Sequence, residues 1–499
     1  MICITIAQES RRFALVDMHN SARQCDLLEI RLDCFGMAPD LGELLEHKPT
    51  PIIMSCRRQE DGGEWDGTDE ERLALLRQCI VSEVDYVEIE LDAADEIPRM
   101  GSTKRVISCY FHAKSTPADI AETYALAQAK DPDVIKLTTM ARTPEAAWPF
   151  VQIMAKPPVP TVIHGIGKPG IMLTILGKKI GSPWTYAALE RGMEAYPAQP
   201  TVHDLREVYH YEDIEKGTRL IGVTGFHAGK VVGAHDREYY TVAGLNAALR
   251  NHELKARCLP LAVGDANMFR KIVNAVKLAS VIVEPGHQDV LPEMAEEKHP
   301  TVTHSGLVDL LLHKGENWHG YFSQAQAAVE ALGMVLKERI DAENPFRDRV
   351  VLIVGLNPVS RLVAADLNHR KASLVIASQD KDAAQELAQK FSCRFVPFEA
   401  IYRTNHNALI VGEDVTSNRK TGGGSLHPSL FKTGQVVMDL DAGVRSSPLL
   451  REASERGSTI VPPWEVLLQD LDLQMKLISG KSAPREVFLE ALKELTEEG

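Results

Sequence analysis

The sequence of 499 residues predicts an α/β protein with an N-terminal (β/α)8 TIM barrel, followed by an α/β region that has a Rossmann-like subdomain. Two observations predict this fold. In the first 200 residues, short apolar or alternating segments are separated by amphipathic stretches, and such alternation of strand and helix indicates parallel strands. After residue 349, apolar strands and helices follow one another again, in the pattern typical of a doubly wound sheet.

The first series contains eight candidate strands, which fit a closed barrel better than an open sheet in about 200 residues. Helix starts are clearest at Thr116-Pro117 and Thr143-Pro144, where a capping hydroxyl precedes a proline at the first helical position. The expected strands are 2–7, 27–33, 51–57, 86–91, 105–111, 134–140, 161–167 and 183–189.

A polar, charged stretch at 206–219 separates the two series, and LIGVTGF at 220–226 begins the second. We therefore expect a barrel domain over 1–212 and a second domain over 219–499. The second domain would comprise a subdomain near 219–320, a Rossmann-like subdomain near 345–460 and C-terminal helices at 463–497.

Composition restricts the function to chemistry on small molecules. The net charge of −14 argues against a nucleic-acid or anionic-membrane binder, and no apolar run is long enough to cross a bilayer. The N-terminus does not resemble a secretory signal. Eight scattered cysteines without a CxxC pair indicate reduced thiols rather than a zinc site. We expect a cytoplasmic enzyme without a metal.

The strand LLEIRLD gives the clearest indication of charged residues inside the barrel. Its apolar residues share one face, so Glu29, Arg31 and Asp33 share the other and point into the barrel. Buried charges are costly unless they pair with one another or bind a polar ligand. Both an internal ion-pair lattice and a ligand site are compatible with this strand.

Lys136 lies on the inward face of a later strand, among apolar neighbours. Burial favours the neutral amine, and a neutral lysine can form an imine with a ketone. The competing interpretation is a structural ion pair between Lys136 and a barrel carboxylate such as Glu29.

Residues 1 to about 208 resemble the type I 3-dehydroquinate dehydratases. The members of that family are (β/α)8 barrels that form a Schiff base with their substrate. The resemblance depends on several motifs in the same order as in that family. These are E-x-R-x-D at 29–33, an arginine–acid–Gly-Gly turn at 57–63, D-Y-V-E-I-E-L at 85–91, the Schiff-base lysine segment at 132–137 and Y-P-A-Q-P-T at 196–201.

The resemblance implies conversion of 3-dehydroquinate to 3-dehydroshikimate and water in the shikimate pathway, with Lys136 as the nucleophile and no cofactor. His112 would take a C2 proton and return it to the departing hydroxyl. Glu60 or Asp61 would orient His112. The residues expected to bind the substrate are Glu29, Arg31, Arg57 and Gln199.

Two positions depart from the family pattern. Tyr110 stands where the family has its catalytic histidine, and His112 lies two residues further on; His164 is a second candidate base. Thr174 replaces an arginine that holds the substrate carboxylate, and Lys178, one helical turn later, would compensate less well.

Residues 219–499 resemble shikimate dehydrogenase, most clearly in the C-terminal stretch that begins at Ser446. The functional positions differ from those of that family. The segment 227–236 has no S-x-S-P motif, and His287, Gln324 and Asp470 replace the family's lysine, aspartate and glutamine.

The nucleotide loop also departs. Around Gly355, Asn357 and Ser360 only the first glycine of the dinucleotide fingerprint is retained, and 378–380 has no arginine for a 2′-phosphate. The resemblance implies NADP as a cofactor, but these changes predict that ordinary dehydrogenase activity is lost.

Our leading hypothesis is a dehydratase fused to a dehydrogenase-like domain without normal redox function. Three others compete with it: a pseudoenzyme that binds or regulates enzymes of the pathway, a bifunctional dehydratase and NADP-dependent shikimate dehydrogenase, and different chemistry at Lys136. Homodimer formation is compatible with all of them.

Overall fold

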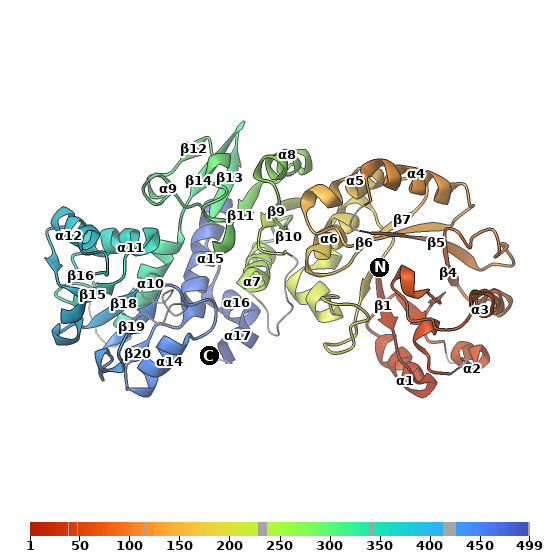
Figure 1. The fold of residues 1–499 in the computed structure, drawn as a ribbon, viewed down its shortest axis with the longest axis horizontal. Helices are drawn as coiled ribbons and strands as arrows, with labels where there is room; N and C mark the ends of the chain where they lie inside the picture. The colour runs from red at the N-terminus through yellow and green to blue at the C-terminus, as the bar shows by residue number, and fades with distance from the viewer. Residues whose placement is uncertain are drawn as a thin grey trace. The chain divides into compact units, whose positions relative to one another are not determined.

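The computed structural model describes residues 1–37, 39–46, 48–112, 115–227, 237–338, 343–412 and 426–497. The chain divides into two compact units, and each is described here by itself (Figure 1). The first unit contains Met1–Ala234 and Lys255–Leu278; the second contains His235–Leu254 and Ala279–Gly499. Among the described residues, no helix is long and apolar enough to cross a membrane.

The first unit contains the predicted barrel. Its eight strands pair in parallel in the order β7-β6-β5-β4-β3-β2-β1-β8, and β8 also contacts β7, so the barrel is nearly closed. The strands are β1 (Ile2–Ile6), β2 (Leu27–Arg31), β3 (Ile52–Ser55), β4 (Tyr86–Glu90), β5 (Lys104–Phe111), β6 (Val134–Thr139), β7 (Thr161–Gly165) and β8 (Thr185–Ala187).

Helices of the barrel begin where the sequence places capping residues. Thr116 caps α4 and Thr143 caps α5, each just before a proline, and Thr68 caps α3 in a capping box with Glu71. These hydroxyls accept hydrogen bonds from backbone N–H groups that the helix itself leaves unpaired. The helices are α1 (Arg11–Ser21), α2 (Leu41–Glu46), α3 (Asp69–Val81), α4 (Pro117–Gln128), α5 (Pro144–Met154) and α6 (Ile171–Ile180).

An apolar layer fills the end of the barrel at which the strands begin. Side chains two residues apart on a strand share a face, so the next inward residue on each strand lies one layer nearer the carboxyl ends. The polar residues of the site occupy that position. The layer consists of Cys3, Leu27, Ile53, Val106, Val134, Val162, Trp184 and Tyr186, with Tyr86 packed against it.

Two glycines allow the end of β7 to touch the start of α6. A Cβ atom on Gly165 would lie 2.4 Å from the carbonyl oxygen of Gly170 and 2.6 Å from its Cα. We expect Gly165→Ala to lower the free energy of unfolding by about 2 kcal/mol or more, because the obstacle is backbone that cannot rotate away. Urea denaturation of the full chain measures this change.

Gly217→Ala is the matched control, because a Cβ there meets no atom within 4 Å. We expect its unfolding free energy to stay within about 0.5 kcal/mol of the wild type. Equal stabilities of the two variants would contradict the close approach of β7 and α6.

The first unit extends beyond the barrel. Strand β9 (Arg219–Val223) pairs in parallel with β10 (Ala256–Pro260), and α8 (Ala266–Val276) contacts α5. Apolar side chains of α8, such as Phe269 and Val273, surround a small cavity together with residues of α5 and α6. The compact unit is thus larger than the segment 1–212, and the domain boundary between 212 and 219 stays a prediction.

The second unit contains the predicted doubly wound sheet. Six parallel strands lie in the order β17-β16-β15-β18-β19-β20, around a core that includes Leu352, Ile401 and Val437. The strands are β15 (Val350–Val354), β16 (Ser373–Ala377), β17 (Arg394–Phe395), β18 (Ala408–Val411), β19 (Val436–Asp439) and β20 (Thr459–Ile460). The helices beside them are α11 (Pro358–His369), α12 (Lys381–Lys390) and α14 (Pro448–Glu455).

The remaining elements of this unit precede and follow that sheet. Strand β13 pairs antiparallel with β11 and β14, and β12 pairs in parallel with β14. These strands are β11 (Ser280–Ile282), β12 (Glu297–Lys298), β13 (Leu310–Lys314) and β14 (Asn317–Tyr321). The helices are α7 (Arg237–Asn251), α9 (Pro300–Ser305), α10 (Gln324–Lys337), α15 (Pro463–Ser479), α16 (Arg485–Ala491) and α17 (Lys493–Glu497).

Candidate active site

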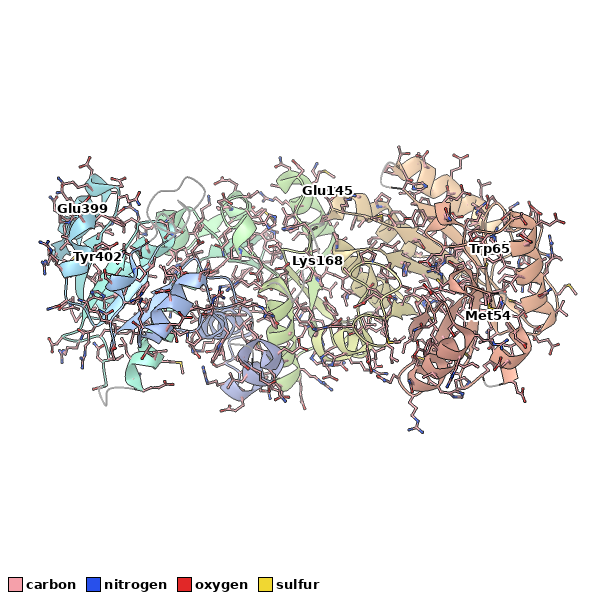
Figure 2. The ribbon with its side chains drawn as sticks, turned by 60° about the horizontal axis from the view of Figure 1, so that its bottom comes forward. Met54, Trp65, Glu145, Lys168, Glu399 and Tyr402 are labelled. Carbon is pink, nitrogen blue, oxygen red and sulfur yellow. The ribbon has the colours of Figure 1, made fainter. Side chains whose placement is uncertain are left out.

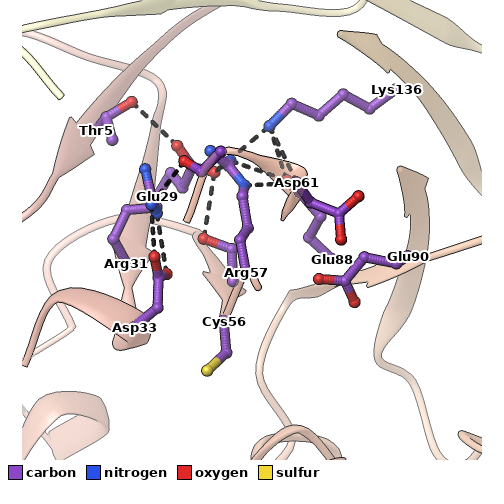
Figure 3. A network of polar contacts seen from close by, with 12 residues as sticks. Thr5, Glu29, Arg31, Asp33, Cys56, Arg57, Asp61, Glu88, Glu90 and Lys136 are labelled. Carbon is purple, nitrogen blue, oxygen red and sulfur yellow. Dashed lines mark hydrogen bonds and ion pairs between the residues drawn. The ribbon is translucent and has the colours of Figure 1, made fainter. Parts of the chain in front are cut away.

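Lys136 lies inside the barrel, with only 1% of its surface exposed (Figure 3). Its Nζ donates to both carboxylate oxygens of Glu88, at 2.9 and 3.2 Å, and lies 3.6 Å from Oε1 of Glu29. The same nitrogen lies 4.2 Å from the ring centroid of Tyr186, over the face of the ring. The structure therefore places a buried amine between two carboxylates and an aromatic ring.

Arg57 joins the two carboxylates. Its Nε donates to Glu88 at 3.0 Å, and its Nη2 donates to Glu29. Burial opposes ionisation of Glu29, but the charges of Arg57 and Lys136 outweigh it and lower the pKa of Glu29 to about 2. The same two cations lower the pKa of Glu88 against the effect of burial. Both carboxylates are therefore ionised at neutral pH.

Arg31 forms a second pair with Asp33, where Nε donates to Oδ1 at 3.0 Å. Asp33 also accepts from the backbone N–H of Glu64 at 2.9 Å, so this pair holds the loop between β3 and α3 that carries Trp65 (Figure 2). Three acids thus balance three bases in the barrel, namely Glu29, Asp33 and Glu88 against Arg31, Arg57 and Lys136.

Gln199 reaches the site through Thr5. Its Nε2 donates to Thr5 Oγ1 at 3.4 Å, and that hydroxyl donates to Glu29 Oε2 at 3.0 Å. Its Oε1 accepts from the backbone N–H of Ala195 at 2.7 Å, which holds the side chain in place. The structure therefore places Gln199 beside Glu29 in the barrel, and its role in substrate binding stays a prediction.

Glu60 and Asp61 contact Arg58. The Arg58 guanidinium lies 3.3 Å from Glu60 and donates to Asp61 at 2.8 Å, and it also binds Asp92. Glu60 is mostly exposed, with 70% of its side-chain surface accessible. The role of these two carboxylates in orienting His112 stays a prediction.

His112 is exposed and follows the last residue of β5. Its ring meets the edge of the half-buried Tyr110 ring, with 5.2 Å between centroids. Thr174 is buried in α6, and Lys178 lies over the ring of Tyr211, 5.2 Å from its centroid.

His164 lies inside the barrel, with 7% of its surface exposed. Its ring packs against Tyr186 and Tyr196, with centroids 4.7 and 4.8 Å apart. Burial, and then the charges of Lys136 and Arg57, lower the pKa of His164 well below 6.5. The imidazole is therefore neutral at neutral pH.

Sequence analysis gave no role to Glu88, which makes the shortest contacts to Lys136. A signal was available, because alternation along 86–90 places Glu88 on the same face as the inward Tyr86. Glu29 lies in a more distinctive motif, which makes it the more conspicuous partner for Lys136 in the sequence.

In the second unit, a buried ionic network contains two of the positions at which the sequence differs from shikimate dehydrogenases, Gln324 and Asp470. Arg237 donates to Glu284 at 2.8 Å and to Asp470 at 2.7 Å. Ser323 Oγ lies 2.8 Å from Asp470 and 3.1 Å from Asp309. Asp309 accepts from the backbone N–H groups of Ser323 and Gln324. Asp470 and the backbone of Gln324 thus belong to one buried network in this unit.

This network contains one guanidinium and three buried carboxylates. Burial raises the pKa of Glu284 and of Asp470, and burial together with the charge of Asp470 raises the pKa of Asp309 well above its usual range. The hydroxyl of Ser323 has one hydrogen and can donate to only one of its two carboxylate neighbours. The folded protein therefore holds protons here that the unfolded chain releases.

We expect that the stability of the Asp309→Asn variant falls less than that of the wild type as the pH rises. A carboxyl whose pKa is raised by folding stabilises the fold fully below its unfolded pKa, about 3.9, and this contribution is lost as pH rises through the folded pKa. The stability of Asp309→Asn relative to wild type should increase by about 1 kcal/mol or more between pH 4.5 and 8. Urea denaturation at both pH values measures it.

Asp289→Asn is the control, because Asp289 is exposed and its effect should be the same at both pH values. Parallel pH profiles for wild type and Asp309→Asn would contradict proton retention at this site.

The loop that follows β15 differs from a dinucleotide-binding loop in the hydrogen bonds at the start of α11. Gly355 follows β15 and has a φ of 91°. Asn357 caps α11, where its side chain accepts from Ser360 N at 2.7 Å, and Pro358 has no N–H to donate. A bound pyrophosphate would need backbone N–H donors at the start of α11, and the side chain of Asn357 already accepts from one of them, the N–H of Ser360. Asp380 caps α12 and would place a carboxylate near the expected 2′-phosphate. Most of the segment 227–236 and the glycine run 422–424 lie outside the described residues.

The described residues contain no group of three or more His, Cys, Asp or Glu side chains that could hold a metal ion.

Comparison with known proteins identifies relatives for the first part of the chain and for its whole length. Residues 2–216 match the family model for type I 3-dehydroquinase. The bifunctional 3-dehydroquinate dehydratase/shikimate dehydrogenase of Arabidopsis thaliana is 24% identical over 491 residues, which cover 93% of this chain and 79% of the relative. The 3-dehydroquinate dehydratase of Methanocaldococcus jannaschii is 27% identical over 222 residues, covering 43% of this chain and 100% of the relative.

Among solved structures, the dehydroquinate dehydratase and shikimate dehydrogenase from S. pombe AroM matches with a TM-score of 0.43 and 17% identity, over 98% of each chain. The first part of the chain is a type I 3-dehydroquinase domain. The chain as a whole is similar to a relative that joins a 3-dehydroquinate dehydratase to a shikimate dehydrogenase.

Proposed function

We propose that the barrel dehydrates 3-dehydroquinate through a Schiff base at Lys136. The observation that carries this proposal is the burial of Lys136 between Glu88 and Glu29, near the carboxyl ends of the barrel strands. Active sites of such barrels lie at that end. The M. jannaschii relative of the barrel is a 3-dehydroquinate dehydratase.

The residues have complementary roles in this proposal. Lys136 must lose a proton before it attacks the C3 carbonyl, and Glu88, 2.9 Å away, is the nearest acceptor. Imine formation releases one water, and the iminium then draws electrons when the C2–H bond breaks. The C1 hydroxyl departs as a second water, and hydrolysis of the imine consumes one and restores Lys136. Proton transfer requires a base, for which the sequence offers His112 and His164.

Glu29, Arg31, Arg57 and Gln199 would bind the hydroxyls and the carboxylate of the substrate. Every one of these side chains already has a partner in the barrel, so the substrate must exchange some ion pairs for its own contacts. Such exchange is compatible with a site that is electrostatically balanced before the substrate binds.

The direct test is the conversion of 3-dehydroquinate to 3-dehydroshikimate by the purified full chain, followed by the absorbance of the conjugated product. We expect turnover without any added cofactor. If no turnover is found at millimolar substrate, the barrel is a binding or regulatory module, or its lysine serves other chemistry.

For the second domain, we propose that ordinary NADP-dependent shikimate dehydrogenase activity is lost. Asn357 at the start of α11 and Asp380 at the start of α12 support this proposal. Calorimetric titration of the full chain with NADPH should give no binding at micromolar concentration. Micromolar binding, followed by reduction of 3-dehydroshikimate, would instead establish a bifunctional enzyme.

A further inference from the structure

We infer that His164 is the base that moves the proton from C2 of the substrate to the departing hydroxyl, an inference that rests on the proposed Schiff base at Lys136. His164 lies on β7, next to the strand β6 that carries Lys136. Three observations support this assignment: its place in the barrel, the aromatic ring that it shares with Lys136, and its electrostatic surroundings.

The register of the strands places His164 nearer than Lys136 to the carboxyl ends of the barrel strands. Lys136 lies opposite Val162, and His164 lies opposite Thr138, two residues nearer the carboxyl ends. Val162 belongs to the apolar layer inside the barrel, so His164 on the same face also points inward. The Lys136 side chain is long, and a substrate attached to its Nζ would extend toward this end of the barrel.

Tyr186 contacts both groups. Lys136 Nζ lies 4.2 Å from its ring centroid, and the His164 ring meets it edge-on at 4.7 Å. Tyr196 meets the His164 imidazole at 4.8 Å in a second edge-on contact. Tyr186 and Tyr196 fix the orientation of the His164 imidazole near Lys136. His164 could therefore accept a proton from a substrate bound to Lys136 without a large movement of its side chain.

The charges around His164 favour an imidazole that is free to accept a proton. Burial and nearby cations disfavour the imidazolium, and Glu88 only partly opposes them. An anionic substrate would favour the imidazolium and raise the basicity of His164 after binding. The groups that act on His164 are Lys136 on β6, Arg57 after β3, Arg31 on β2 and Glu88 on β4, with Tyr186 on β8 and Tyr196 packed against its ring.

His112 has different surroundings. It is exposed, lies beyond the end of β5, and packs on Tyr110. No hydrogen bond or ion pair described for His112 links it to Lys136, Glu88 or Glu29. The buried histidine therefore fits the task better.

The proposed step conserves atoms and charge. The C2–H bond of the iminium breaks, its electron pair forms an enamine, and His164 takes the proton. The C1–O bond then breaks, with electrons returning from the enamine to form the C1–C2 double bond. The proton held by His164 completes the departing water, so no oxidant or metal is required.

The test compares His164→Asn, His112→Asn and the control His19→Asn, an exposed residue on α1. We expect His164→Asn to lower kcat at least 100-fold and to abolish the acid limb of the pH profile. Borohydride with 3-dehydroquinate should still trap an adduct on Lys136 in this variant, because imine formation precedes the proton transfer. The control His19→Asn should keep kcat within a few-fold of the wild type, and His112→Asn should lower kcat far less than His164→Asn does.

Each contrary outcome has a distinct meaning. An active wild type with His164→Asn within twofold of it, or with activity lost only in His112→Asn, would overturn the role of His164 and leave the Schiff base standing. Loss of both adduct and activity in His164→Asn would show that the residue only maintains the site, which also overturns its role as base. A wild type that neither turns over nor traps substrate would overturn the proposed function and this inference together.

Discussion

Replacing Lys136 with methionine is expected to lower kcat for 3-dehydroquinate dehydration by about 1,000-fold or more, because the proposed reaction loses its nucleophile. Methionine fills a similar volume but cannot form an imine. It also leaves Glu29 and Glu88 with Arg57 as their one remaining basic partner among the described contacts. Steady-state kinetics with enzyme at high concentration measure the residual rate.

Lys136→Arg separates the two effects of this substitution. Arginine keeps the positive charge beside both carboxylates, but it stays protonated and is not a nucleophile. We therefore expect Lys136→Arg to be as inactive as Lys136→Met while unfolding at a higher urea concentration. Activity in either variant would show that the barrel works without an imine at this position.

Replacing Arg57 with methionine is expected to have the largest effect on stability, about 3–5 kcal/mol at pH 7, because two buried carboxylates lose a shared partner. The loss should be smaller near pH 3. In the wild type, the lowered pKa of Glu29 stabilises the fold above its unfolded pKa and is lost as pH falls toward about 2. Urea denaturation at pH 7 and pH 3 measures both values.

Arg58→Met is the matched control, because Arg58 is next to Arg57 in the sequence but pairs with carboxylates nearer the surface. The side chains of Asp92 and Glu60 are 65% and 70% exposed, and only Asp61, at 21%, is half-buried. Because exposed pairs contribute at most about 1 kcal/mol, we expect a smaller loss of stability than in Arg57→Met. Similar losses in Arg57→Met and Arg58→Met would contradict the central place of Arg57 in the barrel network.

Much of the fold could be predicted from the sequence. Each barrel strand is a short apolar or alternating segment between polar turns, and prolines after Thr116 and Thr143 mark helix starts. Strand ends were predicted less well. The strand expected at 27–33 ends at Arg31, because Leu32–Cys34 turns into a short 3-10 helix that lets Asp33 meet Arg31.

The site could be predicted in part, because alternation shows which face a residue shares but not which side chains meet. Glu29, Arg31 and Lys136 were predicted to point inward, and they lie in one buried network. The pairing of Lys136 with Glu88 depends on strand register, which the sequence does not specify. The network around Arg237 was missed because its members lie far apart in the sequence and meet only after folding.

The most direct test of the account is borohydride reduction of the full chain in the presence of 3-dehydroquinate, followed by mass spectrometry of its peptides. The account predicts that the mass of the reduced ligand is added to the peptide that contains Lys136, and that Lys136→Arg gains no mass. An unchanged mass at millimolar 3-dehydroquinate, or an adduct on another lysine, would contradict the central claim that Lys136 forms the imine.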